Sequence, residues 1–257
     1  MNLYLTDKLF LVGGATSGFG KAITEQLVAE GAKVIAVART ESKLKDLQDK
    51  SNDIEIVATD LSEESALDKV LDQIGNRVLT GAVINSGGPP AMPVMDTKLS
   101  DWDEAYKTVV RWKIALTQAL LPKMMDNGYG RLLYIESVST KQPVENLVLS
   151  NAMRLAVTGY VKTLSQEIGS SGVTLNILGP GYHATQRMEN LFAKNSQLKG
   201  ISEAEIRKTF SEQTAVKKIG NPDDFASLAL WLLSPHSGYI TGQTITIDGG
   251  LVKGTMG

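Results

Sequence analysis

The sequence predicts a doubly wound α/β fold with a parallel sheet of seven strands, formed by a single domain of residues 1–257. Seven short runs rich in Val, Ile and Leu alternate with longer amphipathic stretches. These runs are apolar almost continuously, as strands covered by helices on both faces are. Because no linker, internal repeat or low-complexity tract interrupts the alternation, we expect one domain.

The expected strands are residues 9–13, 33–38, 54–58, 82–85, 131–136, 173–178 and 244–247. Helix signals lie between them. Ser100 is expected to pair with Asp103 as a helix cap, and Asn221 with Pro222 to begin the last helix. The polar stretch 183–215 is expected to form a helical insertion that serves as a lid.

The amino-acid composition argues against nucleic-acid, metal and membrane partners. The chain has 26 basic and 28 acidic side chains, so it lacks the positive field that holds nucleic acid, and we expect no nucleic-acid partner. It has no cysteine and only two histidines, which suits a reducing, cytoplasmic environment and predicts no metal site. The first apolar run is too short for a signal peptide or a membrane span, so we expect a soluble protein without a membrane partner.

A glycine-rich turn follows the first strand, with the sequence GGATSGFG at residues 13–20. Glycines at such a turn let backbone N–H groups approach an anion, and the following helix adds the partial positive charge of its N-terminus. The turn therefore predicts a site for the diphosphate of a dinucleotide, although a tight turn without a ligand stays open on this motif alone. The expected contacts are Gly14, Thr16, Ser17, Gly18, Phe19 and Gly20.

The second strand ends in Arg39 and Thr40, where an enzyme that prefers NAD carries an acidic residue. A guanidinium and a hydroxyl suit the additional 2′-phosphate of NADP, so NADP is the expected cofactor and NAD is less favoured. A solvated arginine at a strand end is the alternative. Asp60 and Leu61, after the third strand, are expected to contact the adenine.

Further segments resemble the short-chain dehydrogenase/reductase family, in the family's order and over about residues 5–252. They are Asn85-Ser86-Gly87-Gly88, Ser137, the Asn176–Gly181 step with Thr185, and the C-terminal segments 220–224 and 240–250. The resemblance is to the 3-oxoacyl-carrier-protein reductase branch. It implies a Rossmann fold, cofactor contacts from Asn85, Gly87, Pro180, Gly181 and Thr185, and a homotetramer built on helices at 100–125 and 150–170 and on the C-terminal strand.

The resemblance fails at three of the family's four catalytic positions. The serine is Ser137, but the tyrosine position holds Ser150, the lysine position Arg154 and the asparagine position Val109. An arginine can still hydrogen-bond the nicotinamide ribose, but it cannot release a proton near neutrality. We therefore assign Ser137, Ser150 and Arg154 as the candidate catalytic residues.

Three other side chains near this site are alternative proton donors. Tyr182 and His183 lie on the loop expected to flank the nicotinamide, and Lys141 lies four residues past Ser137, but each is more simply an ordinary loop residue. Glu136 could hold Lys141 or Arg154 in place, although strand alternation places it opposite Ser137 and we do not expect it to be a catalyst.

These observations favour an NADP-dependent reductase or dehydrogenase of a small carbonyl compound or alcohol, whose identity the sequence does not reveal. The second hypothesis is a pseudoenzyme that binds the dinucleotide in a regulatory or scaffold role, since three catalytic positions are replaced. A lyase or epimerase that uses a bound cofactor structurally is less favoured, because no pair of bases is evident.

Overall fold

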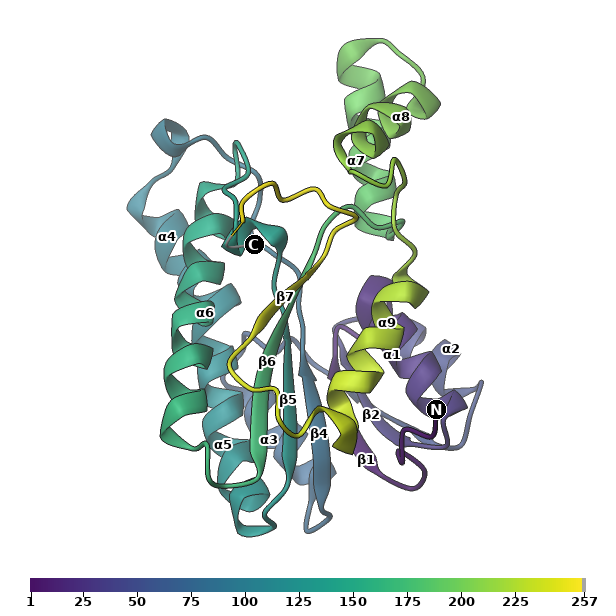
Figure 1. Cartoon of the computed structure of the whole chain (residues 1–257), viewed down its shortest axis with the longest axis vertical. Helices are drawn as coiled ribbons and strands as arrows, with labels where there is room; N and C mark the ends of the chain where they lie inside the picture. The colour runs from purple at the N-terminus through teal and green to yellow at the C-terminus, as the bar shows by residue number, and fades with distance from the viewer. Residues whose placement is uncertain (256–257) are drawn as a thin grey trace.

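The computed structural model describes residues 1–255 and contains one parallel sheet with the strand order β3-β2-β1-β4-β5-β6-β7 (Figure 1). Each neighbouring pair is parallel, and the order reverses direction between β1 and β4. The strands are β1 (Leu9–Gly13), β2 (Lys33–Ala38), β3 (Ile54–Ala58), β4 (Leu79–Ile84), β5 (Gly130–Ile135), β6 (Val173–Pro180) and β7 (Thr244–Ile247). The predicted doubly wound sheet is confirmed, and the strand ends differ from the predicted ones by at most three residues.

Helices cover both faces of the sheet (Figure 1). One apolar core joins the sheet to α1 (Gly18–Ala29), α2 (Glu41–Gln48) and α9 (Pro222–Leu233). The other joins it to α3 (Ser65–Ile74), α5 (Trp112–Asp126) and α6 (Val148–Glu167). Every residue of β1, β4 and β5 is buried, which explains why these strands are continuously apolar in the sequence.

The segment expected to be one helix at 100–125 is divided into three parts. It begins as α4 (Leu99–Ala105), continues through a π-helical stretch at Tyr106–Arg111 and ends as α5. The expected cap by Ser100 and Asp103 is wrong, because the helix starts earlier: the Asp101 carboxylate accepts from the backbone N–H of Lys98 at 2.8 Å. A π-helical stretch inside an α-helix often marks a functional site.

The cap of the last helix is as predicted, with the Asn221 side chain accepting from the backbone N–H of Asp223 at 3.0 Å. The segment 183–215 forms α7 (Gln186–Lys199) and α8 (Glu203–Gln213). Because α7 follows the carboxyl end of β6, both helices stand at the carboxyl edge of the sheet, at the top of Figure 1. Within residues 1–255, no helix has the length and apolar character that crossing a membrane requires.

Candidate functional site

The glycine-rich turn lies at the carboxyl end of β1, where ligands bind in open α/β sheets. Gly14 has a φ of +64°, and a Cβ atom there would lie 2.7 Å from Asn85 Nδ2. A Cβ atom at Gly20 would overlap the Gly14 carbonyl group. The turn therefore requires glycine at both positions, and it brings the start of α1 against the chain that follows β1.

The N-terminus of α1 leaves its backbone donors available to a ligand. Ser17 is the N-cap residue, but its side chain makes no capping hydrogen bond, and the first turn contains no acidic residue. Ser17 is exposed, whereas Thr16 and Phe19 are partly buried. Free N–H groups and an uncompensated helix dipole together suit a phosphate group.

Arg39 and Asp60 meet at the ends of β2 and β3. Arg39 is exposed, and its Nη1 lies 3.9 Å from Asp60 Oδ2. Asp60 also accepts from the backbone N–H and the hydroxyl of Ser62, and although partial burial opposes it, these bonds and the charge of Arg39 lower the pKa of Asp60. Thr40 is exposed, and Leu61 packs against the core. The Arg39 guanidinium is therefore exposed to solvent beside the expected adenosine site.

The loop after β4 and the loop after β6 both adjoin the glycine-rich turn. Asn85, after β4, donates from its side chain to the Gly13 carbonyl oxygen at 3.1 Å. Thr185 caps α7, and its methyl group would lie 3.3 Å from a Cβ atom at Gly18. At the start of the loop that carries Thr185, Pro180 ends β6 and the N–H of Gly181 donates to the Ile247 carbonyl oxygen at 2.9 Å. The segments singled out in the sequence therefore adjoin one edge of the sheet, where Gly87 is also exposed.

Ser150 and Arg154 lie on one face of α6, and both are buried. Arg154 Nε donates to Ser150 Oγ at 3.1 Å. The same guanidinium donates through Nη1 to the backbone oxygen and to the carboxylate of Glu136, each at 2.9 Å. Arg154 thus ties α6 to the end of β5, and it leaves the Ser150 O–H free to donate to another group.

Of the two partners proposed for Glu136 from the sequence, Lys141 and Arg154, the structure therefore shows Arg154. Its second partner is Lys113, on α5, whose ammonium group donates to the Glu136 carboxylate. Lys113 is only 1 % exposed, and burial, followed by the charge of Arg154, lowers its pKa against the opposing effect of Glu136. Lys113 lies one helical turn past Val109, which is buried in the apolar core. Lys113 was not predicted from the sequence, because no local pattern distinguishes it from an exposed lysine.

Ser137 follows Glu136 directly and is partly exposed. Its Oγ accepts from the backbone N–H of Ser139 at 3.0 Å. The Ser137 hydroxyl thus resembles that of Ser150: each accepts a hydrogen bond from the protein and keeps its own O–H for a ligand.

Two of the loop candidates for a proton donor, His183 and Tyr182, are packed against aromatic side chains. His183 is 3 % exposed and packs edge-on against Phe19 and Phe225, and burial lowers its pKa. Tyr182 packs on Phe210, its hydroxyl donates to the Gln213 side chain at 3.1 Å, and burial raises its pKa. Both side chains therefore contribute to packing between the loop and its neighbouring helices.

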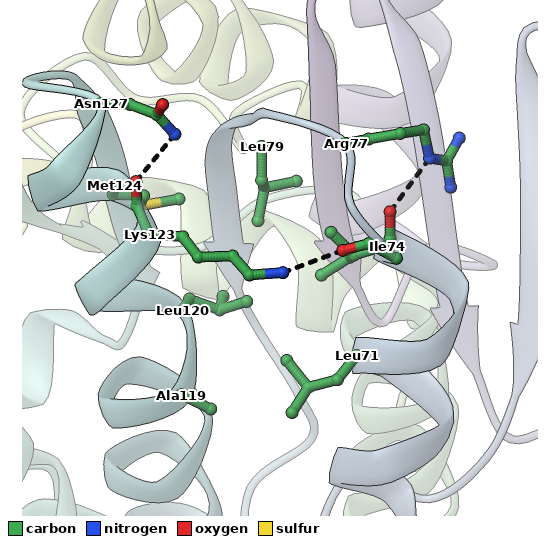
Figure 2. Close-up of a pocket in the computed structure, with 10 residues that line it drawn as sticks. Leu71, Ile74, Arg77, Leu79, Ala119, Leu120, Lys123, Met124 and Asn127 are labelled. Atoms are coloured by element: carbon green, nitrogen blue, oxygen red, sulfur yellow. Dashed lines mark hydrogen bonds between the residues drawn. The ribbon is translucent and has the colours of Figure 1, made fainter.

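A separate cavity of about 160 Å³ lies between the C-terminal part of α5, the end of α3 and the start of β4 (Figure 2). Its two cations already have partners: Lys123 donates to the Gly75 carbonyl oxygen at 3.0 Å, and Arg77 to that of Ile74 at 3.1 Å. It adjoins the amino end of β4, opposite the loops described above. Among residues 1–255, no group of three or more His, Cys, Asp or Glu side chains is placed to hold a metal ion.

Comparison with known proteins identifies the class. Residues 14–252 match the family model described as enoyl-(acyl carrier protein) reductase. The chain therefore belongs to the short-chain dehydrogenase/reductase family, and it is similar to the 3-oxoacyl-carrier-protein reductase branch.

Two curated relatives illustrate this similarity. The 3-oxoacyl-acyl-carrier-protein reductase FabG of Vibrio cholerae is 30% identical over 252 residues, covering 96% of this chain and 98% of the relative. The acetoacetyl-CoA reductase of an Acinetobacter species is 28% identical over 254 residues, covering 95% and 98%.

Among solved structures, L-sorbose reductase of Gluconobacter frateurii in complex with NADPH and L-sorbose superposes with a TM-score of 0.93 at 23% identity, covering 99% of this chain and 100% of that one. At this identity the superposition supports the fold alone.

Proposed function

We propose that this chain is an NADP(H)-dependent oxidoreductase that interconverts a carbonyl group and an alcohol on a small molecule, with an atypical set of catalytic side chains. The relatives are reductases of 3-oxoacyl and acetoacetyl thioesters, and the L-sorbose reductase structure contains NADPH. The observation that carries the proposal is the pair of serine hydroxyls, Ser137 and Ser150, whose O–H groups remain available at the expected reaction site.

The residues at the carboxyl edge fit the proposed cofactor. Backbone N–H groups of the turn at Gly14–Gly20 and at the start of α1 would hold the diphosphate, and Arg39 with Thr40 would hold the 2′-phosphate, which makes NADP favoured over NAD. Asp60 and Leu61 would contact the adenine. Asn85, Gly87, Pro180, Gly181, Thr185 and Arg154 would surround the nicotinamide end. The bound cofactor supplies the hydride.

The chain itself would then supply hydrogen-bond donors to the carbonyl oxygen. Because Ser150 accepts from a permanently charged guanidinium, its O–H is polarised and donates more strongly. Ser137 adds a second donor. Two oriented donors stabilise the negative charge that develops on this oxygen during reduction. Arg154 holds Ser150 in place and keeps its proton, so the alcohol takes its proton from the serine hydroxyl, which solvent replenishes.

The test is a titration of the protein with NADPH, followed by NADPH oxidation measured by absorbance over a panel of acyl thioesters and simple ketones. We expect NADPH to bind and at least one compound to oxidise it. Tight binding without oxidation across a broad panel would reject the catalytic proposal.

That outcome would support the second candidate, a pseudoenzyme that binds the dinucleotide in a regulatory or scaffold role. The observation in its favour is that Ser150, at the position of the family's tyrosine, is 6 % exposed and already bonded to Arg154. Absence of binding by NADPH and by NADH would reject both candidates.

Three further expectations belong to this proposal. We propose that 183–215, which forms α7 and α8, acts as a lid over the nicotinamide end of the site. By resemblance to the family, we propose a cytoplasmic homotetramer built on the helical segments 100–125 and 150–170 and on β7. Light scattering coupled to size-exclusion chromatography measures the oligomeric state directly.

A further inference from the structure

We propose that the substrate carries an anionic group, a carboxylate in the simplest case, and that Arg187 binds this group beside Arg154. The inference rests on the proposed function, because it names the substrate class of the same site. Its basis is an arrangement of two guanidinium groups around Gly88, in the loop that follows β4.

Arg187, in the first turn of α7, reaches across to this loop. A Cβ atom at Gly88 would lie 3.2 Å from Arg187 Nη1 and 3.0 Å from Arg154 Nη2. Both guanidinium groups therefore contact nearly the same point, and glycine at position 88 provides the space for them. Two cations placed around one point repel each other, and an anion between them offsets this repulsion.

The protein provides too little negative charge for this arrangement. Within residues 1–255 no ion pair or hydrogen bond joins Arg187 to a carboxylate, and the only charge that shifts its pKa is that of Arg154. The nearest carboxylate in the network, that of Glu136, is already shared by Arg154 and Lys113. Around this site the three cations Lys113, Arg154 and Arg187 are therefore accompanied by a single carboxylate, that of Glu136.

Arg187 is exposed to solvent, so a ligand can reach it. Even so, partial desolvation of its guanidinium, followed by the positive charge of Arg154, lowers its pKa. A bound carboxylate would relieve this repulsion and accept two parallel hydrogen bonds from the planar guanidinium.

The position of the pair favours the substrate over the cofactor as the source of the anion. Arg154 bonds Ser150, so this end of the pair lies beside the hydroxyl expected to contact the carbonyl oxygen. The diphosphate has its own donors at the start of α1. A carboxylate held by Arg187 would therefore anchor an oxo acid with its carbonyl group near the two serines.

The experiment compares oxo acids with their methyl esters, for example acetoacetate with methyl acetoacetate and pyruvate with methyl pyruvate. NADPH oxidation is measured for the wild type, for Arg187→Ala and for the matched control Lys194→Ala, which removes an exposed cation from the same helix. In the wild type we expect kcat/KM for an acid to exceed that for its ester by about tenfold or more. Arg187→Ala should abolish this preference and change the Kd for NADPH by less than about twofold, and Lys194→Ala should preserve it.

Equal use of acid and ester by the wild type would overturn the proposal. So would an Arg187→Ala variant whose main defect is weaker NADPH binding, because the anion would then be the cofactor's diphosphate.

If no compound oxidises NADPH, the proposed function is rejected, but a binding measurement still tests whether Arg187 binds an anion. Isothermal titration of the NADP⁺-saturated protein then compares the same acids and esters. Tighter binding of the acid that is lost in Arg187→Ala supports the site, and equal or absent binding of the two overturns it.

Discussion

Arg154 and Glu136 form a buried ion pair, with Nη1 and Oε2 2.9 Å apart, at the point where α6 meets the end of β5. The carboxylate also holds Lys113, so one anion compensates two cations inside the protein. Removing the shared anion Glu136 and removing the cation Lys113 should therefore have unequal effects.

Glu136→Gln should destabilise the protein far more than Lys113→Met. The first change leaves two buried cations without a counter-charge, and breaking such a pair costs about 3–5 kcal/mol. The second leaves the balanced pair of Glu136 and Arg154 and replaces a desolvated ammonium with an apolar side chain, so we expect a change within about 1.5 kcal/mol. Urea unfolding measures both, and a Lys113→Met variant as unstable as Glu136→Gln would contradict this order.

Ser150→Ala and Ser137→Ala should each lower kcat while leaving the Kd for NADPH nearly unchanged. Each removes a hydroxyl whose O–H is free to bind the carbonyl oxygen, and loss of one such donor costs about 10²- to 10³-fold in kcat. Steady-state kinetics and fluorescence titration separate the two quantities. Ser139→Ala is the matched control, because it removes the neighbouring buried hydroxyl and retains the backbone N–H that bonds Ser137. A kcat unaffected by both active-site changes would remove the serines from the mechanism.

Arg39→Ala should weaken the binding of NADPH by about 10- to 100-fold and that of NADH by less than about threefold. The exposed guanidinium lies 3.9 Å from Asp60, so it is held loosely and can turn to a phosphate group. Lys43→Ala, in the helix that follows, provides a control for the change in net charge. An equal loss of affinity for both dinucleotides would refute the phosphate role of Arg39.

The sequence predicted those features that depend on local pattern. Strands such as β1 and β5 are buried on both faces, so they are recognisable in the sequence as continuous apolar runs. The turn at Gly14–Gly20 is recognisable by its glycines. Lys113 and Arg187 could not be predicted, because the role of each depends on a charged side chain that is distant in the sequence. Lys113 meets Glu136 only when α5 packs on the end of β5, and Arg187 approaches Arg154 only because the first turn of α7 and α6 both place a guanidinium beside Gly88.

His183 illustrates the same limit and makes the protein's stability depend on pH. The sequence left it as an ordinary loop residue with a proton donor as the alternative, but the fold buries it between Phe19 and Phe225 and against Gly220. Burial lowers its pKa, whereas the Gly181 carbonyl group and the charges of Asp224 and Asp248 oppose this effect only in part.

The unfolded chain therefore takes up a proton on His183 near its ordinary pKa of 6.5, at a pH where the folded protein keeps the imidazole neutral. The stability that His183 provides is complete above that value and is lost as the pH falls through the lowered pKa. We expect the free energy of unfolding, measured with urea, to fall between about pH 8 and pH 5.5 by more in the wild type than in His183→Leu. The control is His236→Gln, which removes the other histidine and leaves the aromatic cluster intact, so it should retain the wild-type loss. If His183→Leu and the wild type lost stability in parallel on acidification, His183 would not be the buried neutral group that the fold indicates.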